Sequence, residues 1–349
     1  KLKRDIFSLR ILILWLIVCS AVIPVLGQET AGTIPFASSS PKCAAVYETG
    51  DRLFVCDNAA TIHIYNGTTL TGLGTVPLDS SANSMVVHEG SGKLYAAINA
   101  LQKVAVINAA TGTFSGYLSG TYPNSPILIV DESLGKLYIL PSVFNTFGLW
   151  QVDTATDAET YIPGFDSGAY VTMALNPVTH ELFLPYIVGD GMSIVDGVTL
   201  ATSTVNNLGA IDVGVNWNEN KVYTIYPMKV YDRDTGTIDS IGAGNDACTT
   251  IIYNPTGNRM ITSSEVNRLS TIIDCDTDEY FNLPMYGATT EIAVCYATNH
   301  VFYACPDSVG ILDDQTQLLE FIPVTPSNSG IVVNQTTRRV FVLCLDSVA

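Results

Sequence analysis

The chain has 349 residues, of which 47% are hydrophobic, and a formal net charge of −17 that comes from 16 basic and 33 acidic residues. Nucleic acids bind basic surfaces and anionic membranes attract basic segments, so this charge argues against both as partners. Apart from one apolar run near the N-terminus, no segment of the sequence has the composition of a membrane span.

Residues 1–27 have the pattern of a secretory signal peptide. Four basic residues precede an apolar run from Ile11 to Val25, and Val25 and Gly27 occupy the −3 and −1 positions before Gln28. The run is shorter than the roughly 20 residues of a membrane-spanning helix, which favours a cleaved signal over an uncleaved anchor. We therefore expect a secreted or cell-surface protein with no membrane insertion after cleavage.

Residues 28–349 repeat one pattern, in which a polar and mostly basic residue precedes an aliphatic and then usually an aromatic residue. The eight copies end at Phe54, Tyr95, Tyr138, Phe183, Tyr223, Ile261, Phe302 and Phe341. Successive copies are therefore 38 to 45 residues apart. A nearly constant period in this range indicates an array of one supersecondary unit.

Each repeat contains four short apolar segments that are separated by turn residues. In the fourth copy they are Thr172–Leu175, Leu182–Leu184, Met192–Val195 and Ala201–Val205. Alternating segments of this length, rich in β-branched and aromatic residues, predict strands. The sequence therefore predicts an all-β fold, a β-propeller of four-stranded antiparallel blades with the first strand innermost.

Two local signals fit the ends of the predicted strands. The third strand ends on Asp or Asn, which hydrogen-bond the backbone of a following turn, in seven copies: Asn66, Asn108, Asp153, Asp196, Asp232, Asp274 and Asp313. The fourth strand often carries a proline, which suits an outer edge because proline has no N–H: Pro77, Pro163, Pro284 and Pro323. The acidic pair that starts at Asp232 and the acidic triplet that starts at Asp274 resemble calcium loops, but we interpret both as turns of this kind.

The ends of the chain predict how the ring closes. Thr33–Phe36 looks like a fourth strand, whereas Ile331–Asn334 and Val340–Leu343 supply only the first two strands of an eighth copy. We expect eight blades, with the N-terminal strand outside the last one; seven blades and the start of another module are the alternative. Because the sequence starts at Lys1 and stops inside a third strand, we expect a propeller domain over residues 28–349 with an incomplete, C-terminally truncated last blade, and further modules in a longer protein.

The repeat resembles the YVTN family of β-propeller repeats of extracellular and surface-layer proteins. The resemblance rests on Ala174-Leu175-Asn176-Pro177, on Lys93-Leu94-Tyr95, on Val104-Ala105-Val106-Ile107-Asn108 before Thr111-Gly112, and on Asp232-Arg233-Asp234-Thr235-Gly236. It covers residues 33–349 and implies the propeller fold. Propellers with such repeats include binding modules and enzymes, so the resemblance does not specify a function.

The start of each first strand lies 11 residues before the end of the repeated pattern, and these positions meet at one mouth of a propeller's central channel. They are Cys43, Ser84, Ile127, Thr172, Asp212, Thr250, Glu291 and Gly330. The preceding loops add further polar residues. From both groups we select as candidate binding residues Ser84, Asn124, Asp166, Asp212, Asp246, Glu291 and Asn328.

These features favour an extracellular binding or structural module that contacts a protein or glycan with its channel-mouth loops and needs no cofactor. Phosphate-binding, nucleophile and haem motifs are absent from the sequence. The four histidines lie in different copies, and we interpret them as solvated turn residues. Seven cysteines follow the signal, and an oxidising compartment permits disulfides whose pairing the sequence does not assign. The alternative is a lactonase- or esterase-like hydrolase with one divalent cation near Asp212 and Glu291, and no identified catalytic residue.

Overall fold

The computed structural model describes most of the repeat region. The described residues are 32–36, 39–123, 126–141, 148–163, 165, 170, 172–187, 189–242, 248–264, 266–285, 287–324, 330–344 and 347–348. All of them belong to one compact unit, Gly32–Ala349. The predicted signal peptide, residues 1–27, lies outside the described residues and stays a prediction.

Within these ranges the chain forms eight four-stranded antiparallel sheets. Seven sheets contain four consecutive strands each, from β2–β5 to β26–β29, and we number these blades one to seven in chain order. The eighth combines β30, β31 and β32 with β1 from the N-terminal end of the unit. The predicted all-β propeller of four-stranded blades is therefore confirmed.

The first strands of the eight sheets are β2 (Pro41–Tyr47), β6 (Ser84–His88), β10 (Ile127–Asp131), β14 (Ala174–Asn176), β18 (Asp212–Asn216), β22 (Thr250–Asn254), β26 (Glu291–Cys295) and β30 (Gly330–Asn334). The second strands are β3 (Arg52–Asp57), β7 (Lys93–Ile98), β11 (Lys136–Leu140), β15 (Glu181–Tyr186), β19 (Lys221–Ile225), β23 (Arg259–Ser263), β27 (His300–Cys305) and β31 (Arg339–Leu343).

The third strands are β4 (Thr61–Asn66), β8 (Lys103–Asn108), β12 (Gly148–Asp153), β16 (Gly191–Asp196), β20 (Lys229–Asp232), β24 (Leu269–Asp274), β28 (Ser308–Asp313) and β32 (Ser347–Val348). The outermost strands are β5 (Gly72–Pro77), β9 (Thr113–Tyr117), β13 (Glu159–Pro163), β17 (Thr202–Asn206), β21 (Ile238–Ser240), β25 (Tyr280–Pro284), β29 (Leu318–Pro323) and β1 (Ile34–Pro35). A short 3₁₀ helix, η1 (Asn99–Leu101), follows β7. Among the described residues, no helix is long and apolar enough to cross a bilayer.

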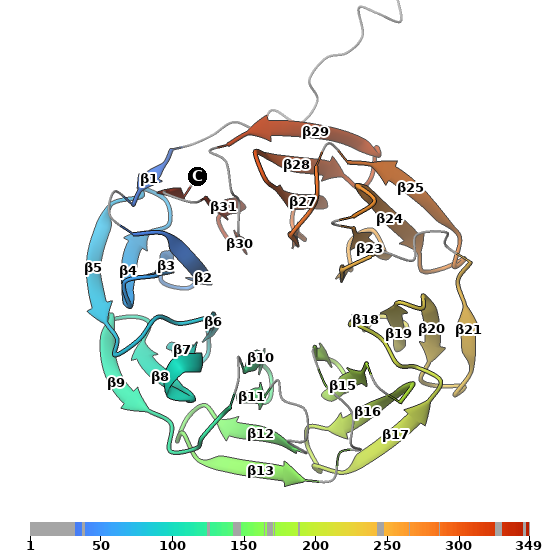
Figure 1. The fold of residues 1–349 in the computed structure, drawn as a ribbon, viewed down its shortest axis with the longest axis horizontal. Helices are drawn as coiled ribbons and strands as arrows, with labels where there is room; N and C mark the ends of the chain where they lie inside the picture. Colours follow the sequence, from blue (N-terminus) through green and yellow to red (C-terminus); the bar gives the residue numbers. More distant parts are fainter. Residues whose placement is uncertain are drawn as a thin grey trace, which may run out of the picture. The chain divides into compact units, whose positions relative to one another are not determined.

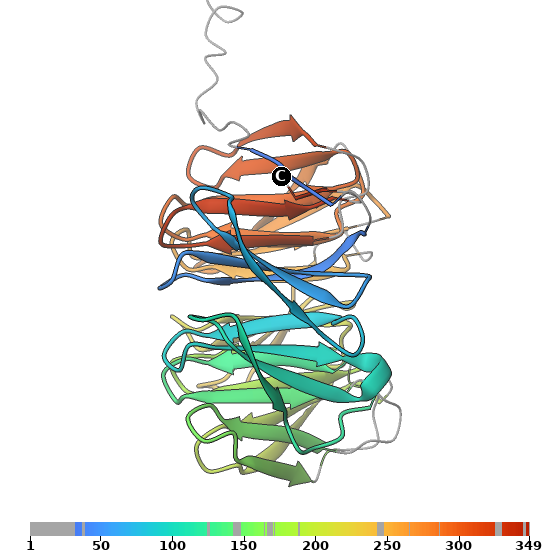
Figure 2. The ribbon, with the colours of Figure 1, turned by 90° about the vertical axis from the view of Figure 1, so that its left-hand side faces the viewer.

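The sheets are sectors of a ring (Figure 1), with first strands such as β2, β6 and β18 around its centre and strands such as β5, β13 and β29 along its rim. Seen edge-on, the strands run across the ring from one face to the other (Figure 2). Because the strands alternate in direction, the first strands start on the same face on which the second strands end. We call this the start face, and we call the opposite one, which carries the turns between first and second strands, the hairpin face.

The repeated pattern marks the second strand because that strand is covered on both of its sides. Its aliphatic and aromatic residues are both inaccessible to solvent in most copies, as Leu94 and Tyr95 are in β7. In the described residues, seven clusters of buried apolar side chains each join two neighbouring blades. Packing between blades, rather than within one, therefore buries the apolar surface of each sheet.

In several copies the polar residues of the pattern tie one blade to the next. The ammonium of Lys93 contacts a carboxylate oxygen of Asp157 in the next blade at 2.7 Å, and the Tyr95 hydroxyl donates to the same carboxylate at 3.2 Å. In the same way, Arg259 of the sixth blade binds the fully buried carboxylate of Asp314 at 2.7 Å. In these copies the basic residue or the aromatic hydroxyl therefore helps to fix the contact between blades.

The predicted turns after the third strands are confirmed. Every one of the seven Asp or Asn residues accepts a hydrogen bond from a backbone N–H two or three residues later. In the segments that resemble calcium loops, the remaining carboxylates also have protein donors, from Asn220 to Asp234 and from Tyr223 to Asp278. These segments therefore form turns that support the ring.

The predicted closure of the ring is also confirmed. Ile34 and Pro35 of β1 pair with Val348 and Ser347 of β32, so the N-terminal strand forms the outer edge of the eighth sheet. β32 has two described residues, and the incompleteness of the last blade stays a prediction. The prolines that were assigned to outer edges end β5, β13, β25 and β29.

Candidate functional site

The predicted ring of start positions is present on the start face. Six of the eight predicted residues are the first residues of their strands: Ser84, Ile127, Asp212, Thr250, Glu291 and Gly330. The neighbouring first strands contact one another around the ring, including β30 with β2. Four of the predicted binding residues, which are Asn124, Asp166, Asp246 and Asn328, lie outside the described residues and stay predictions.

Asp212 joins three neighbouring blades at this face. Its Oδ1 accepts from the Thr172 hydroxyl at 2.7 Å and from its neighbour Val213 N–H at 2.9 Å. Its Oδ2 accepts from the N–H of Ile251 in the sixth blade at 3.1 Å. Burial raises the pKa of this carboxyl, and the three donors oppose part of that effect because they stabilise the ionised form.

Glu291 occupies the equivalent position in the seventh blade and makes an equivalent contact. Its Oε2 accepts from the N–H of Ile331 in the eighth blade at 3.0 Å. The residue as a whole is exposed, but its carboxyl lies against β30, and this loss of hydration raises its pKa while the Ile331 N–H lowers it. Both carboxylates therefore bind a backbone N–H of the next first strand.

The protein donors around Asp212 limit what this carboxylate could bind. A cation would have to replace hydrogen bonds from Thr172, Val213 and Ile251, because all three donors already point at its oxygens. Among the described residues, no group of three or more His, Cys, Asp or Glu side chains could hold a metal ion. The geometry supports a role for Asp212 in joining blades, and a cation near Asp212 and Glu291 stays a prediction.

Three of the four histidines have separate partners, whereas both ring nitrogens of His300 are buried without a hydrogen-bond partner among the described residues. His63 Nε2 lies 2.9 Å from a carboxylate oxygen of Asp57, and His180 Nδ1 lies 2.8 Å from one of Asp131. The interpretation of His88 as a solvated turn residue is wrong, because it is only 4% exposed and lies within hydrogen-bond distance of the Ser91 hydroxyl. The His63–Asp57 pair therefore lies within the first blade, whereas the His180–Asp131 pair joins the fourth blade to the third.

Exposed apolar side chains lie on the start face in three consecutive blades. Ile187, Tyr226 and Val266 occupy the connections from second to third strands of blades four, five and six, and they are 50%, 59% and 75% exposed. Tyr226 directly follows Ile225, the residue that pairs with Asp212. These residues were not among the candidates predicted from the sequence, although their apolar character inside predicted turns was a signal that could have marked them.

The lengths of the connections distinguish the two faces. On the hairpin face, four residues join the first and second strands in all eight blades. On the start face, the connections between blades contain 5 to 10 residues, and those between second and third strands contain 2 to 7. The start face therefore combines a regular scaffold with connections that differ from blade to blade.

The hairpin face carries a chain of acidic residues that the sequence analysis did not identify. Glu132 accepts from the N–H of Glu89, Glu89 accepts from the N–H groups of Glu48 and Thr49, and Glu48 accepts from the N–H of Gln335. The bonds are 2.7 to 3.0 Å long. Each of these carboxylates therefore bridges to the turn of the adjacent blade.

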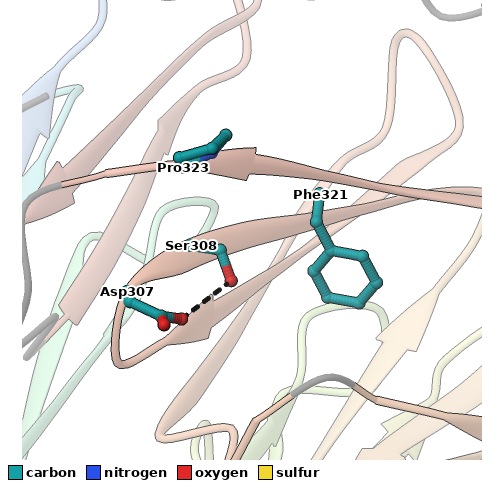
Figure 3. A pocket seen from close by; sticks show the side chains of 4 residues that line it. All are labelled: Asp307, Ser308, Phe321 and Pro323. Atoms are coloured by element: carbon teal, nitrogen blue, oxygen red, sulfur yellow. Dashed lines mark hydrogen bonds between the residues drawn. The ribbon is translucent and has the colours of Figure 1, made fainter.

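The pocket in Figure 3 lies at the outer part of the seventh blade. Asp307, Ser308, Phe321 and Pro323 line this open hollow of about 310 Å³, and the Ser308 hydroxyl donates to Asp307 at 3.4 Å. All four residues belong to the β27–β28 connection, β28 or the outermost strand β29, whereas Glu291 starts the innermost strand of the same blade. The pocket is thus separate from the predicted ring of start positions.

Comparison with known proteins identifies the fold and no family. No protein-family model and no curated protein matches the chain. Among solved structures, 1738 chains match, so the fold is too common to specify a function. One of them is the crystal structure of Saccharomyces cerevisiae Sqt1, which has a TM-score of 0.73 at 10% identity and covers 90% of this chain and 96% of its own.

Proposed function

We propose that this β-propeller is an extracellular protein-interaction module that binds its partner with the start face. β-Propellers typically serve as interaction modules, and the similarity to Sqt1 extends over nearly the whole of both chains. The observation that carries the proposal is the difference between the faces, since the connections of the start face vary in length far more than those of the hairpin face. Rigid scaffolds with variable loops are suited to recognition.

The exposed side chains on this face fit a protein partner better than a glycan. Ile187, Tyr226 and Val266 offer apolar and aromatic surface, and aromatic side chains are frequent anchors of protein interfaces. The exposed aromatic residues of the rim are partly used within the chain. Phe114 packs on Tyr117 with ring centroids 5.1 Å apart, and the Tyr280 hydroxyl donates to a backbone carbonyl.

The apolar residues of the hairpin face provide a matched control. Val178 and Val198 in the fourth blade are 64% and 61% exposed on that face. We would immobilise the wild-type chain and two variants. The start-face variant combines Ile187→Ser, Tyr226→Ser and Val266→Ser. The Val178/Val198 variant combines Val178→Ser and Val198→Ser. Extracellular proteins bound by each would be quantified by mass spectrometry, and retained glycans would be assayed in parallel.

The proposal predicts a protein that the wild-type chain and the Val178/Val198 variant retain and the start-face variant loses by tenfold or more. Equal retention by the start-face variant would contradict the assignment of the face. Loss only in the Val178/Val198 variant would move the site to the hairpin face, and retention of a glycan alone would refute a protein partner. Circular dichroism of all three chains shows whether each is folded.

The extracellular location rests on residues 1–27 and has its own test. Expression with these residues should release a chain whose N-terminus, by protein sequencing, is Gln28. A chain that keeps residues 1–27 in the membrane fraction would refute cleavage and support an anchor. This result is independent of which face binds the partner.

A further inference from the structure

Two cysteines of the first blade lie directly opposite each other. Cys43 of β2 and Cys56 of β3 are cross-strand partners, just after a register shift between Pro41 and Cys43. Directly opposite residues of antiparallel strands have Cα atoms about 4.5–5.5 Å apart. This separation is within the roughly 4.4–6.8 Å that a disulfide spans. The two residues are therefore placed for a cross-strand disulfide.

Both sulfur atoms contact the same residue of the next connection. The Cys43 thiol donates to the carbonyl oxygen of Ala82 at 3.6 Å, and the N–H of Ala82 donates to the Cys56 sulfur at 3.2 Å. Ala82 lies between β5 and β6, in the connection from the first to the second blade. The two thiols thus lie on one side of the blade and hold this connection in place.

The accessibility of the two thiols differs. Cys43 lies near the start of β2, the innermost strand of the first blade, and is half-buried, whereas the other described cysteines, including Cys56, are buried. A reagent from solvent can therefore reach Cys43 first. Cys56 lies next to Cys43, so it can react with a mixed disulfide on Cys43 without being reached from solvent itself.

The interaction between the thiols shifts both of their pKa values. Contact with Cys56, together with burial, raises the pKa of Cys43. The same contact lowers the pKa of Cys56, and the N–H of Ala82 lowers it further, although burial opposes both effects. Cys56 is therefore the sulfur that holds negative charge more easily, which suits it as the attacking sulfur of the second step of an exchange. The first step falls to Cys43 because of its accessibility, not because of its pKa.

We propose that Cys43 and Cys56 are a reversible redox site that is oxidised to a disulfide by small-molecule or protein disulfides. In the first step the Cys43 sulfur attacks a disulfide RSSR, which forms a mixed disulfide and releases one thiol RSH. In the second step the Cys56 sulfur attacks Cys43, which closes the protein disulfide and releases the second RSH. The protein loses two hydrogen atoms, and RSSR gains them.

Oxidation should change the connection at Ala82. A disulfide has no S–H group, so Cys43 can no longer donate to the Ala82 carbonyl, and the sulfur of Cys56 becomes a weaker acceptor for the Ala82 N–H. The amide of Ala82 should therefore exchange its hydrogen faster in the oxidised protein. Oxidation of the two cysteines would thus alter the connection that leads into the second blade.

Peptide mapping of the mature chain tests the proposal. The folded protein is equilibrated in mixtures of reduced and oxidised glutathione, its free thiols are alkylated, and it is digested with trypsin. Cleavage after Lys42 and Arg52 separates residues 43–52 from residues 53–93, so a disulfide appears as two linked peptides. We expect this linked pair to form in oxidising mixtures and to disappear completely in reducing ones.

Three variants test the order of the steps. Cys56→Ser should leave one glutathione on Cys43, because no second thiol displaces it, and Cys43→Ser should leave Cys56 reduced. Cys305→Ser, which removes a buried cysteine of the seventh blade, should behave like the wild type. If a variant does not fold, the peptide map of the wild-type protein still shows whether the Cys43–Cys56 disulfide forms reversibly. A wild-type protein in which Cys43 only carries glutathione, stays reduced, or pairs with another cysteine would overturn the proposal.

Discussion

Asp212 offers a sharp test of whether the start-face carboxylates join blades. The substitution Asp212→Ala removes the acceptor of three hydrogen bonds, among them those from the N–H groups of Val213 and Ile251, and both of these residues are buried. A buried donor without an acceptor costs about 1–3 kcal/mol. Removing a desolvated carboxylate offsets part of this cost. We therefore expect the free energy of unfolding to fall by about 2 kcal/mol.

The effect should depend on pH in a defined direction. Burial raises the pKa of the Asp212 carboxyl in the folded protein. The unfolded chain, with a pKa of about 3.9, then ionises at a lower pH than the folded one. The contribution of Asp212 is fully present below the unfolded pKa and declines as pH rises to the folded pKa. The cost of Asp212→Ala should therefore be larger at mildly acidic than at neutral pH.

The assay is urea unfolding of the wild type and the variant between pH 4 and pH 7, monitored by tryptophan fluorescence. Asp239→Ala is the matched control, since Asp239 is an exposed acid on β21 of the same blade. It should change the free energy of unfolding by less than about 0.5 kcal/mol. An Asp212→Ala variant as stable as the wild type, or a cost that grows with pH, would refute the reasoning.

Three further variants or conditions test other contacts. Asp314→Ala should destabilise the protein by about 3–5 kcal/mol, because the partly buried Arg259 loses its fully buried partner, and urea unfolding measures this. Glu89→Ala should speed hydrogen exchange at the Glu48 amide, because its carboxylate acceptor is lost; unchanged exchange would contradict the bridge between turns. Turn N–H groups lower the pKa of Asp232, so the stability it contributes should be lost as pH falls below about 4, and Asp232→Asn should reduce that loss.

The sequence predicted the architecture because the relevant signals are local. The repeated pattern marked the second strand, the Asp and Asn residues marked turns within three residues of themselves, and proline marked outer edges. The closure of the eighth sheet followed from the same reasoning, since Thr33–Phe36 resembled a fourth strand and Ile34 pairs with Val348. Signals of this kind need no knowledge of how the blades pack.

Contacts between blades could not be predicted in the same way. Lys93 and Asp157 are 64 residues apart, and their ion pair depends on the stagger of two sheets that the sequence does not encode locally. The register of β2 with β3 is regular from the turn to Cys43 and Cys56, but the contact of both sulfur atoms with Ala82 depends on how the next connection packs, which no local signal encodes. The exposure of Tyr226 likewise depends on what covers its connection.

The central claim is that a protein partner binds the start face, and site-specific photocrosslinking tests it most directly. A photoreactive amino acid would replace Val266 on the start face or Val198 on the hairpin face, two residues of similar size and exposure. In extracellular material from the source organism, the account predicts one dominant protein adduct at position 266 and none at position 198. The same adduct at both positions, or an adduct at position 198 alone, would contradict it.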